Sequence, residues 1–384
     1  MQIIFSDSPQ PQQITHSIFL AGPSPRKPQD NNWRIEAIEI LKKLNFTGQV
    51  FIPIPKEKFY NGQDENSWTY LKQIQWECSF RHIADKIVFW VPRSIAHEQP
   101  GFTTNVEFGE DLHSGKIIYG RPDNADKCRY LDERIKQIQQ PIFNTLEKTL
   151  EYTVTQLANP SVRDNGEIFI PLHIWQDNEF QTWYTNLKNN GNQLIEAKVL
   201  HHYTVGQNKL FSYVLKVNIF IKSENRYKDN EFVFFRKSIS SVLAFYEDTN
   251  TKQTYIVLIK EFRSPVNNNE GYIYELPSGS SFDNISPQEN AKNELLEETG
   301  IVIDDINRFI FVSNRQIAAT LSSNKCHLYK VQLTQQEFNA IDTQKIHGEN
   351  LEYEQTHVVI CKKQDALHLP LDYNTIGMIF CALQ

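Results

Sequence analysis

The chain has 384 residues, of which 40% are hydrophobic and 12% aromatic, and this length allows two domains with sizeable cores. The net charge of -7 argues against a protein that binds duplex nucleic acid, because such proteins carry an excess of basic residues. The five cysteines form no CxxC pair, which predicts reduced thiols in a cytoplasmic protein and no zinc site. The polar N-terminus predicts no signal peptide, and no apolar run is long enough to span a membrane.

In the first third of the chain, short apolar runs alternate with amphipathic helical patterns. The runs 17–21, 50–54, 86–91 and 116–119 predict strands, and helices are expected at 33–44, at 67–84 and from near 105. This alternation is typical of an α/β domain with a doubly wound parallel sheet. Such a sheet binds its ligand at the carboxyl ends of its strands, where segments 22–26 and 101–107 both fall.

The segment 101–109 contains the first candidate for a catalytic residue, Glu107. It follows the strand-like run 86–91, and we expect Glu107 in the first turn of the helix that comes next. There the helix dipole would keep the carboxylate ionised, and an ionised carboxylate is a competent nucleophile toward a sugar carbon. The alternative is structural, because Thr104-x-x-Glu107 also has the pattern of a capping box that begins a helix.

Five motifs in this part of the chain occur in the order found in one enzyme family. They are Phe19-Leu20-Ala21-Gly22-Pro23, Trp33-Arg34, Gln75-Trp76-Glu77, Ala84-Asp85 with Phe89-Trp90-Val91-Pro92-Arg93, and the segment 101–109. Together they resemble the nucleoside 2-deoxyribosyltransferase-like family over residues 1–124. The resemblance implies a flavodoxin-like sheet, no cofactor, and cleavage of the C–N bond of a nucleoside. It assigns the attack on the anomeric carbon to Glu107.

The same resemblance implies that Glu77 holds or protonates the base, whereas the alternative for Glu77 is a solvated charge on a helix. It also suggests substrate contacts at the positions Gly22, Pro23, Ser24, Arg26, Asp85 and Asn105, and the alternative for Asp85 is a residue at the entry of a strand that binds the backbone. Ser24 and Arg26 could hold a 5′-phosphate, although Arg26 fits an ordinary surface arginine equally well. One departure stands out: the transferases carry an aspartate six residues before the nucleophile, and this chain has Gly101. Hydrolysis of a nucleotide therefore competes with transfer between bases.

Residues 125–192 carry no catalytic pattern and are expected to form a helical and aromatic connector. A β-rich domain is then expected at 193–384, and its clearest local signal is a helix that begins at Ser286-Pro287 and ends at Gly300. This helix carries Glu294, Glu297 and Glu298 on one face. Three close carboxylates suit Mg²⁺ or Mn²⁺, and the alternative is a charged helix surface without a metal.

The segment 279–301 resembles a Nudix box, and the strands before it resemble the ADP-ribose pyrophosphatase branch of the Nudix hydrolases. The resemblance implies an α/β/α sandwich with a mixed sheet, metal-assisted hydrolysis of a nucleoside diphosphate-linked compound with Glu298 as a catalytic residue, and substrate contacts from Arg263 and Glu275. The box departs from the family at Ile285, where a glutamate is usual, and at Asn293, where an arginine is usual.

These patterns predict a two-domain enzyme that acts on small-molecule nucleosides or nucleotides, with no membrane partner. The first domain would cleave or transfer at the N-glycosidic bond, and the second would hydrolyse a diphosphate. In the alternative, the Nudix-like domain is catalytically degenerate and senses a ligand that regulates the glycosidase. A homo-oligomer is compatible with the sequence.

Overall fold

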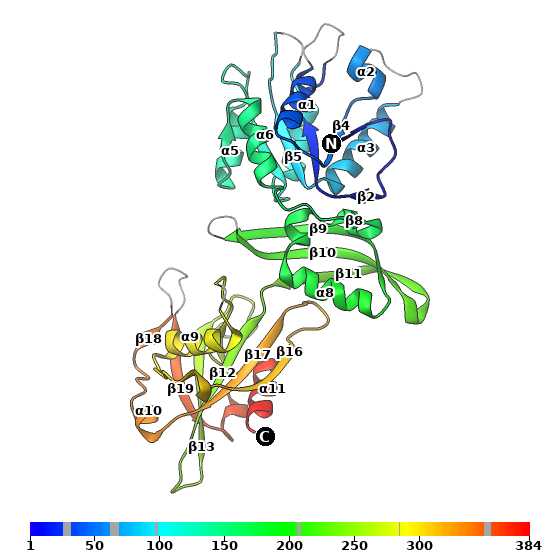
Figure 1. Ribbon diagram of the computed structural model, residues 1–384. Coiled ribbons are helices and arrows are strands. Elements are labelled where there is room, and N and C mark those ends of the chain that lie inside the picture. Colours follow the sequence, from blue (N-terminus) through cyan, green and yellow to red (C-terminus); the bar gives the residue numbers. More distant parts are fainter. Residues whose placement is uncertain (26–31, 62–68, 97–98, 206–208, 284, 349–354) are drawn as a thin grey trace. The chain divides into compact units, whose positions relative to one another are not determined.

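The computed structural model describes residues 1–25, 32–61, 69–96, 99–205, 209–283, 285–348 and 355–384. The chain forms two compact units, Met1–Phe234 and Phe235–Gln384 (Figure 1). No helix in the described ranges has the length and apolar composition needed to cross a membrane.

The centre of unit 1 is a six-stranded sheet in which every neighbouring pair of strands is parallel. The strand order is β1-β4-β3-β5-β6-β7, with bounds β1 Gln2–Phe5, β3 Ser17–Ala21, β4 Gln49–Ile52, β5 Lys86–Trp90, β6 Ile117–Gly120 and β7 Ile142–Phe143. From β3 the chain adds β4 on one side, and then returns to add β5 on the other side. The strand order therefore reverses between β3 and β5. In a doubly wound sheet, the ligand-binding crevice lies at the carboxyl ends of the two strands between which the order reverses.

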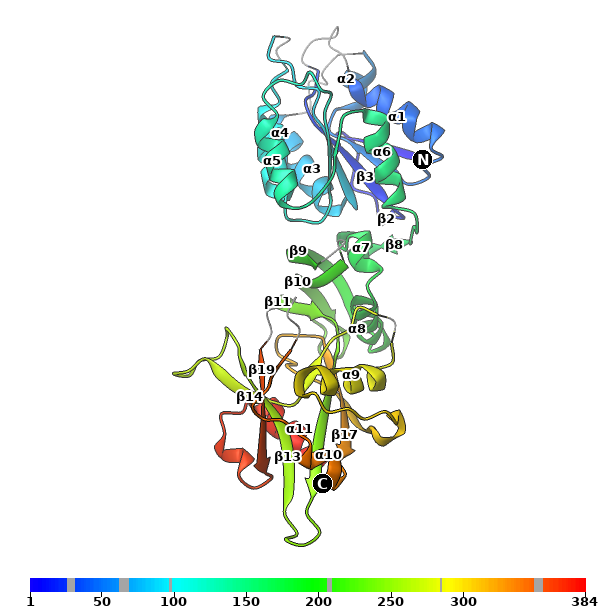
Figure 2. The same cartoon turned by 90° about the vertical axis from the view of Figure 1, so that its left-hand side faces the viewer.

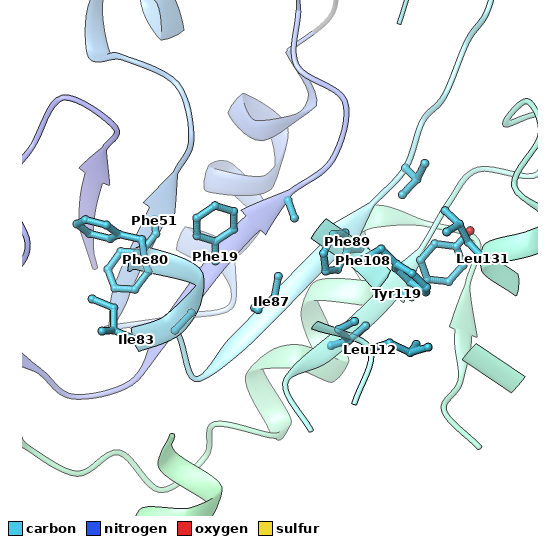
Figure 3. Packing of buried hydrophobic residues seen from close by; sticks show 14 of the residues in the cluster. Phe19, Phe51, Phe80, Ile83, Ile87, Phe89, Phe108, Leu112, Tyr119 and Leu131 are labelled. Carbon is cyan, nitrogen blue, oxygen red and sulfur yellow. The ribbon is translucent and has the colours of Figure 1, made fainter. Parts of the chain in front are cut away.

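Both faces of this sheet are buried, because the strands are apolar at successive positions. One face packs against α3 (Tyr70–Ile83), α4 (Phe102–Asp111) and α5 (Arg129–Gln137). The opposite face packs against α1 (Trp33–Lys43) and α6 (Leu146–Thr155), as Figure 2 shows. In β3, Phe19 contributes to the first core and Leu20 to the second. Figure 3 shows the first core, where Phe19, Phe51 and Phe89 meet side chains of the covering helices. The predicted parallel α/β arrangement is confirmed.

Residues 125–192 are part of unit 1, not a separate connector, because α5, β7 and α6 complete the parallel sheet and its two helical layers. After α6, the chain returns to the start of the unit, where β8 (Arg163–Asp164) pairs with β2 (Gln13–Ile14). The short helices η1 (Asn165–Phe169) and α7 (Leu172–Trp175) follow, and then α8 (Asn178–Asn189). The predicted aromatic cluster of this region packs on itself: Phe180 and Tyr184 stack with ring centroids 5.6 Å apart.

The boundary between the units lies near residue 235, whereas the sequence places it at 193. The strands between these positions, β9 (Gln193–Val205), β10 (Lys209–Ile221) and β11 (Arg226–Arg236), form a separate three-stranded sheet. Strand β9 is held by unit 1, because the Ala197 carbonyl lies 2.8 Å from the ring Nε2 of His82 in α3. In addition, Gly166 of η1 lies so close to the Leu194 carbonyl that a side chain would not fit between them.

Unit 2 is built on a mixed sheet with the order β16-β17-β12-β13-β19-β18, to which β14 adds on β13 and β15 on β12. The strand bounds are β12 Ile239–Glu247, β13 Thr254–Phe262, β14 Tyr272–Glu275, β15 Ser278–Gly279, β16 Ile310–Gln316, β17 Lys325–Gln332, β18 Ile346–His347 and β19 Thr356–Lys362. Strands β12 and β17 are parallel, and β13 is antiparallel to both β12 and β19.

Helices cover both faces of the sheet in unit 2. Alternate residues of β12 point to opposite cores: Val242 packs beneath α9 (Pro287–Thr299), and Leu243 packs beneath α11 (Tyr373–Ala382). The predicted start and end of α9 are confirmed, since the Ser286 side chain accepts a hydrogen bond from the Glu289 amide and Gly300 ends the helix with φ 72°. The remaining short helices of the described chain are α2 (Lys56–Asn61), η2 (Lys222–Glu224), η3 (Ile306–Arg308), α10 (Gln335–Asn339) and η4 (Ala366–His368).

Candidate active site

Two glycines allow the loops after β3 and β5 to pack against each other at the carboxyl end of the sheet. A Cβ atom at Gly22 would lie 2.1 Å from the carbonyl oxygen of Trp90, the last residue of β5. Gly101 has φ 57°, and a Cβ atom there would lie 2.8 Å from Cγ of Pro23. An aspartate at position 101 would therefore collide with Pro23 unless the loop shifted, and it would have to adopt a backbone conformation that favours glycine.

The helix after this loop begins earlier than the sequence indicates, at Phe102, with Gly101 as its N-cap residue. The expected capping box is therefore wrong: Thr104 is a buried residue within the first turn. Glu107 lies in the second turn, beyond the residues where the helix dipole acts most strongly. The helix dipole therefore does not determine the charge state of Glu107, which depends on the side chains around it.

Arg34 of α1 organises the first loop from inside the protein. Its side chain is fully buried and donates hydrogen bonds to the carbonyl oxygens of Leu20, at 2.9 Å, and Gly22, at 2.8 Å. It also lies 3.2 Å from Ser24 Oγ. Burial lowers the pKa of the Arg34 guanidinium to about 10, and the charges of Glu107 and Glu77 oppose this effect. Arg34 thus shapes the loop and brings a buried positive charge toward both predicted catalytic carboxylates.

Glu77 of α3 is a half-buried carboxylate with one polar neighbour on its own helix. The Gln73 amide donates to Glu77 Oε1 over 2.8 Å and to the Pro53 carbonyl over 2.9 Å, so Gln73 ties the carboxylate to the segment after β4. Burial raises the pKa of Glu77, while the hydrogen bond from Gln73 and the charges of Arg34 and Arg81 lower it. Glu77 is therefore not the solvated helix charge of the alternative interpretation.

Glu107 has the most perturbed carboxyl group in this region. Its pKa is raised to about 7, mainly by burial and also by the negative charge of Glu77, while the charges of Arg81 and Arg34 oppose the shift. This corrects the expectation of a fully ionised carboxylate, because desolvation outweighs the nearby positive charges. Since the negative charge of Glu77 helps to raise the pKa of Glu107 to about 7, the pair retains a proton at mildly acidic to neutral pH. One protonated and one ionised carboxyl can serve as an acid and a nucleophile.

Arg81 of α3 fixes α4 beside the pair. Its guanidinium makes ion pairs with Asp111, at 2.5 Å, and Glu110, at 2.7 Å, and donates to the Glu107 carbonyl at 3.4 Å. Arg81, Arg34 and Gln73 are not among the site residues predicted from the sequence. Only Arg34 had a signal, as part of the Trp33-Arg34 motif.

The other predicted substrate residues of unit 1 have different surroundings. Asn105, in the first turn of α4, accepts a hydrogen bond of 2.5 Å from Arg93 through Oδ1. Arg26 lies outside the described residues.

Asp85 is at the amino end of β5, away from the loops that contain Gly22 and Gly101. It is fully buried, and its carboxylate binds Arg163, the Leu172 amide and Ser17. All of these partners belong to the protein, and the amides of Ser17 and Leu172 are the backbone partners that the structural alternative for Asp85 expects.

The comparison with protein families agrees with this site. Residues 15–124 match the nucleoside 2-deoxyribosyltransferase-like family. The match contains β3, the loop at Gly22, Glu77, and α4 with Glu107, and it indicates a domain for glycosyl transfer on nucleosides. It gives no support for a Nudix domain in the C-terminal part of the chain. No curated protein matches the chain.

In unit 2, the acidic face of α9 lies against β15. Glu298 is buried, and its carboxylate accepts a hydrogen bond of 2.9 Å from the Ser278 amide. The Glu294 carboxylate is so close to Gly279 that a Cβ atom there would lie 2.4 Å from Oε1. Arg263 joins Glu261, at 2.8 Å, and Glu275, at 3.0 Å, so the two predicted substrate residues Arg263 and Glu275 pair with each other.

The predicted metal ligands do not form a ready metal site. Among the residues that the structure describes, no group of three or more His, Cys, Asp or Glu side chains could hold a metal ion. Glu294, Glu297 and Glu298 offer the hard oxygen atoms that Mg²⁺ prefers, but Glu298 is directed to the Ser278 amide and Glu294 to Gly279. A metal site at these three carboxylates therefore stays a prediction.

Proposed function

We propose that unit 1 cleaves the N-glycosidic bond of a nucleoside or nucleotide, with Glu107 as nucleophile. The observation that carries this proposal is the pair of interacting carboxyl groups, Glu77 and Glu107, within a segment that matches the deoxyribosyltransferase-like family. When the edge strand β1 is left out, the strand order is β4-β3-β5-β6-β7, and the order reverses between β3 and β5. This order supports a flavodoxin-like domain that binds its ligand beside the loops after β3 and β5.

The reaction requires the form of the pair in which Glu77 carries the proton and Glu107 is ionised. The ionised Glu107 carboxylate attacks the anomeric carbon and forms a glycosyl ester, while the C–N bond breaks and its electron pair leaves with the base. Glu77 in its acid form gives a proton to the departing base nitrogen. Water or a second base then attacks the anomeric carbon, which frees the Glu107 carboxylate.

A turnover screen by mass spectrometry tests this function. Ribonucleosides, deoxyribonucleosides and their 5′-monophosphates would be offered with and without a second free base. We expect release of the free base. A new nucleoside that contains the second base would identify a transferase. Free sugar together with the released base would identify a hydrolase. If every member of the panel stays intact, the proposed function is wrong.

The interaction between the carboxyl groups predicts a pH effect for Glu77→Gln. Removing the negative charge of Glu77 lowers the pKa of Glu107, so a larger fraction of Glu107 is ionised at acidic pH. The rising limb of the pH profile of kcat/KM should therefore move to lower pH, even as the maximal rate falls because the acid is lost. Glu110→Gln is the control, because Glu110 is on the same helix, is mostly exposed and is not among the charges that shift Glu107. If the rising limb of the pH profile lies at the same pH in Glu77→Gln as in wild type, the two carboxyl groups do not interact.

We further propose that unit 2 handles a nucleotide, either as a Nudix-like diphosphate hydrolase or as a ligand sensor for unit 1. Hydrolysis is supported by the helical layers on both faces of a mixed sheet and by the acidic face of α9. Sensing is favoured by the hydrogen bond that the Glu298 carboxylate accepts from the Ser278 amide, and by Ile285 and Asn293 in the box.

Metal-dependent turnover distinguishes these alternatives. ADP-ribose would be incubated with Mg²⁺ or Mn²⁺ and with wild type or Glu298→Gln, and monophosphate products would be measured. Given the arrangement of Glu294 and Glu298, we expect no metal-dependent cleavage above the level of Glu298→Gln. Cleavage that needs both the metal and Glu298 would establish the hydrolase and exclude the sensing alternative.

A further inference from the structure

Unit 2 contains a cavity of about 470 Å³ on the α11 side of its sheet. It lies between the start of β12, the end of β16, the start of β17 and the first turns of α11. The carboxylates of α9 belong to the opposite layer, since α9 packs on the other core of the unit. The cavity volume is within the range of small-molecule sites, so the size suits a ligand larger than a single ring.

The floor of the cavity is apolar, and its rim is polar. The floor consists of Ile239, Leu276, Ile317, Cys326, Leu328 and Met378. The rim carries hydrogen-bonding groups from Ser278, Gln316 and Asn374, and the Tyr373 side chain is 92% exposed beside it. An apolar floor with an aromatic group at the edge suits a flat aromatic ring, while a rim with donors and acceptors suits a hydroxylated group attached to that ring.

The lining of the cavity has no excess of positive charge. The charged residues in it are Glu275, Arg315 and Asp372, two acids and one base. Glu275 shares Arg263 with Glu261. Arg315 and Asp372 remain, and their charges are opposite. An anionic ligand such as a nucleotide phosphate gains no net attraction from this lining, so an uncharged ligand fits better.

We infer that this cavity is a binding site for an uncharged nucleoside. The base would lie on the apolar floor with Tyr373 at its edge, and the sugar hydroxyls would bind the polar rim. This inference goes beyond glycosyl transfer and does not depend on the chemistry of Glu107. It places ligand recognition on the face of the sheet opposite to α9.

Ser278 connects the cavity to α9. It lines the cavity, and its amide donates to the Glu298 carboxylate at 2.9 Å. A ligand that contacts Ser278 would therefore act directly on the residue that holds Glu298, which gives the site a route to the rest of unit 2.

A larger side chain at position 377 in α11 would fill the cavity and so tests the inference directly. Gly377 lines the cavity, and a Cβ atom added there meets no atom within 4 Å. Gly377→Phe should therefore fold, and replacing a glycine within a helix favours the helix by up to about 1 kcal/mol. Binding of adenosine to the full-length chain would be followed by hydrogen–deuterium exchange, which reports separately on segments 313–317 and 372–382. We expect adenosine to protect both segments in wild type and in Gly377→Ala, and binding to be at least about tenfold weaker in Gly377→Phe.

Charged ligands and a second variant make the test specific. AMP should protect these segments less than adenosine at equal concentration, and ribose should not protect them. Asp372→Asn keeps a residue that can cap α11 but leaves Arg315 unbalanced, so it should shift the preference toward AMP. The inference is overturned if adenosine leaves both segments unprotected, if Gly377→Phe binds adenosine as tightly as wild type does, or if wild type prefers AMP. Protection of the Glu107 region alone would support the site of unit 1 while rejecting this one.

Discussion

Replacing Glu107 with glutamine is expected to reduce release of the free base by at least about a thousandfold. Glutamine has nearly the same shape as glutamate, but its amide cannot form the glycosyl ester. Rapid acid quench followed by intact-mass measurement should detect a sugar adduct on the wild-type chain and none on Glu107→Gln. The loss should appear in kcat more than in KM, because the removed group acts on the reacting carbon.

The same substitution should not weaken the fold, and this distinguishes catalysis from structure. The pKa of Glu107 is raised to about 7 in the folded chain, so the ionised carboxylate disfavours folding above that pH. A neutral glutamine removes this cost, so the thermal stability at pH 8 should be unchanged or higher.

Glu110→Gln serves as the matched control for Glu107→Gln, since it lies on the same helix and its ion pair with Arg81 is 2.7 Å long and largely exposed on the Glu110 side. It should retain base release. Base release that persists in Glu107→Gln would refute the assignment of the nucleophile, and an equal loss in both variants would indicate damage to α4.

Replacing Arg163 with methionine is expected to destabilise unit 1 by about 3–5 kcal/mol, as is usual when one partner of a buried ion pair is removed. Both side chains of the pair are fully buried. Arg163 donates to the two carboxylate oxygens of Asp85 at 2.7 and 2.6 Å, and also to the Ile170 and Thr15 carbonyls. Without the guanidinium, Asp85 keeps a carboxylate that has no access to water, and two backbone carbonyls lose a donor.

Hydrogen exchange of the β5 amides at increasing urea concentration measures this effect in unit 1 alone. Lys136→Met is the control, because its ion pair with Glu133 is exposed on both sides and should contribute less than about 1 kcal/mol. The double variant Asp85→Asn with Arg163→Met should recover part of the loss, since it removes the unpaired buried charge. A cost for Arg163→Met no larger than that of Lys136→Met would show that the pair does not hold the unit together.

This ion pair also explains why the folded unit is longer than the segment that matches the family. Asp85 lies inside residues 15–124, whereas Arg163 lies beyond them and is 78 residues away in the sequence. Strand β7 and helices α5 and α6 complete the same sheet from the same later part of the chain. The matching segment therefore lacks both part of its core and the partner of its buried carboxylate.

Several features could be read from the sequence because they depend on neighbours along the chain. The apolar run 86–91 predicts β5, and its two buried faces require helices on both sides. The signals at Ser286, Pro287 and Gly300 locate α9 because capping uses backbone groups within one turn of the helix end. Glu77 and Glu107 could be selected because their motifs occur in the order of a known family.

Other features were decided only by the tertiary structure, because they depend on residues that are distant in the sequence. The raised pKa of Glu107 results from burial and from Glu77 on another helix, so local sequence indicated full ionisation where the folded chain has a pKa of about 7. The partners of Asp85 could not be predicted, because Arg163 and Leu172 bind its carboxylate from much later in the chain. The early start of α4 depends on the packing of Gly101 against Pro23, and the nucleoside-sized cavity depends on α11 lying across strands from four parts of the chain. Local patterns determine which elements form, whereas burial and long-range contacts determine what each side chain in them can do.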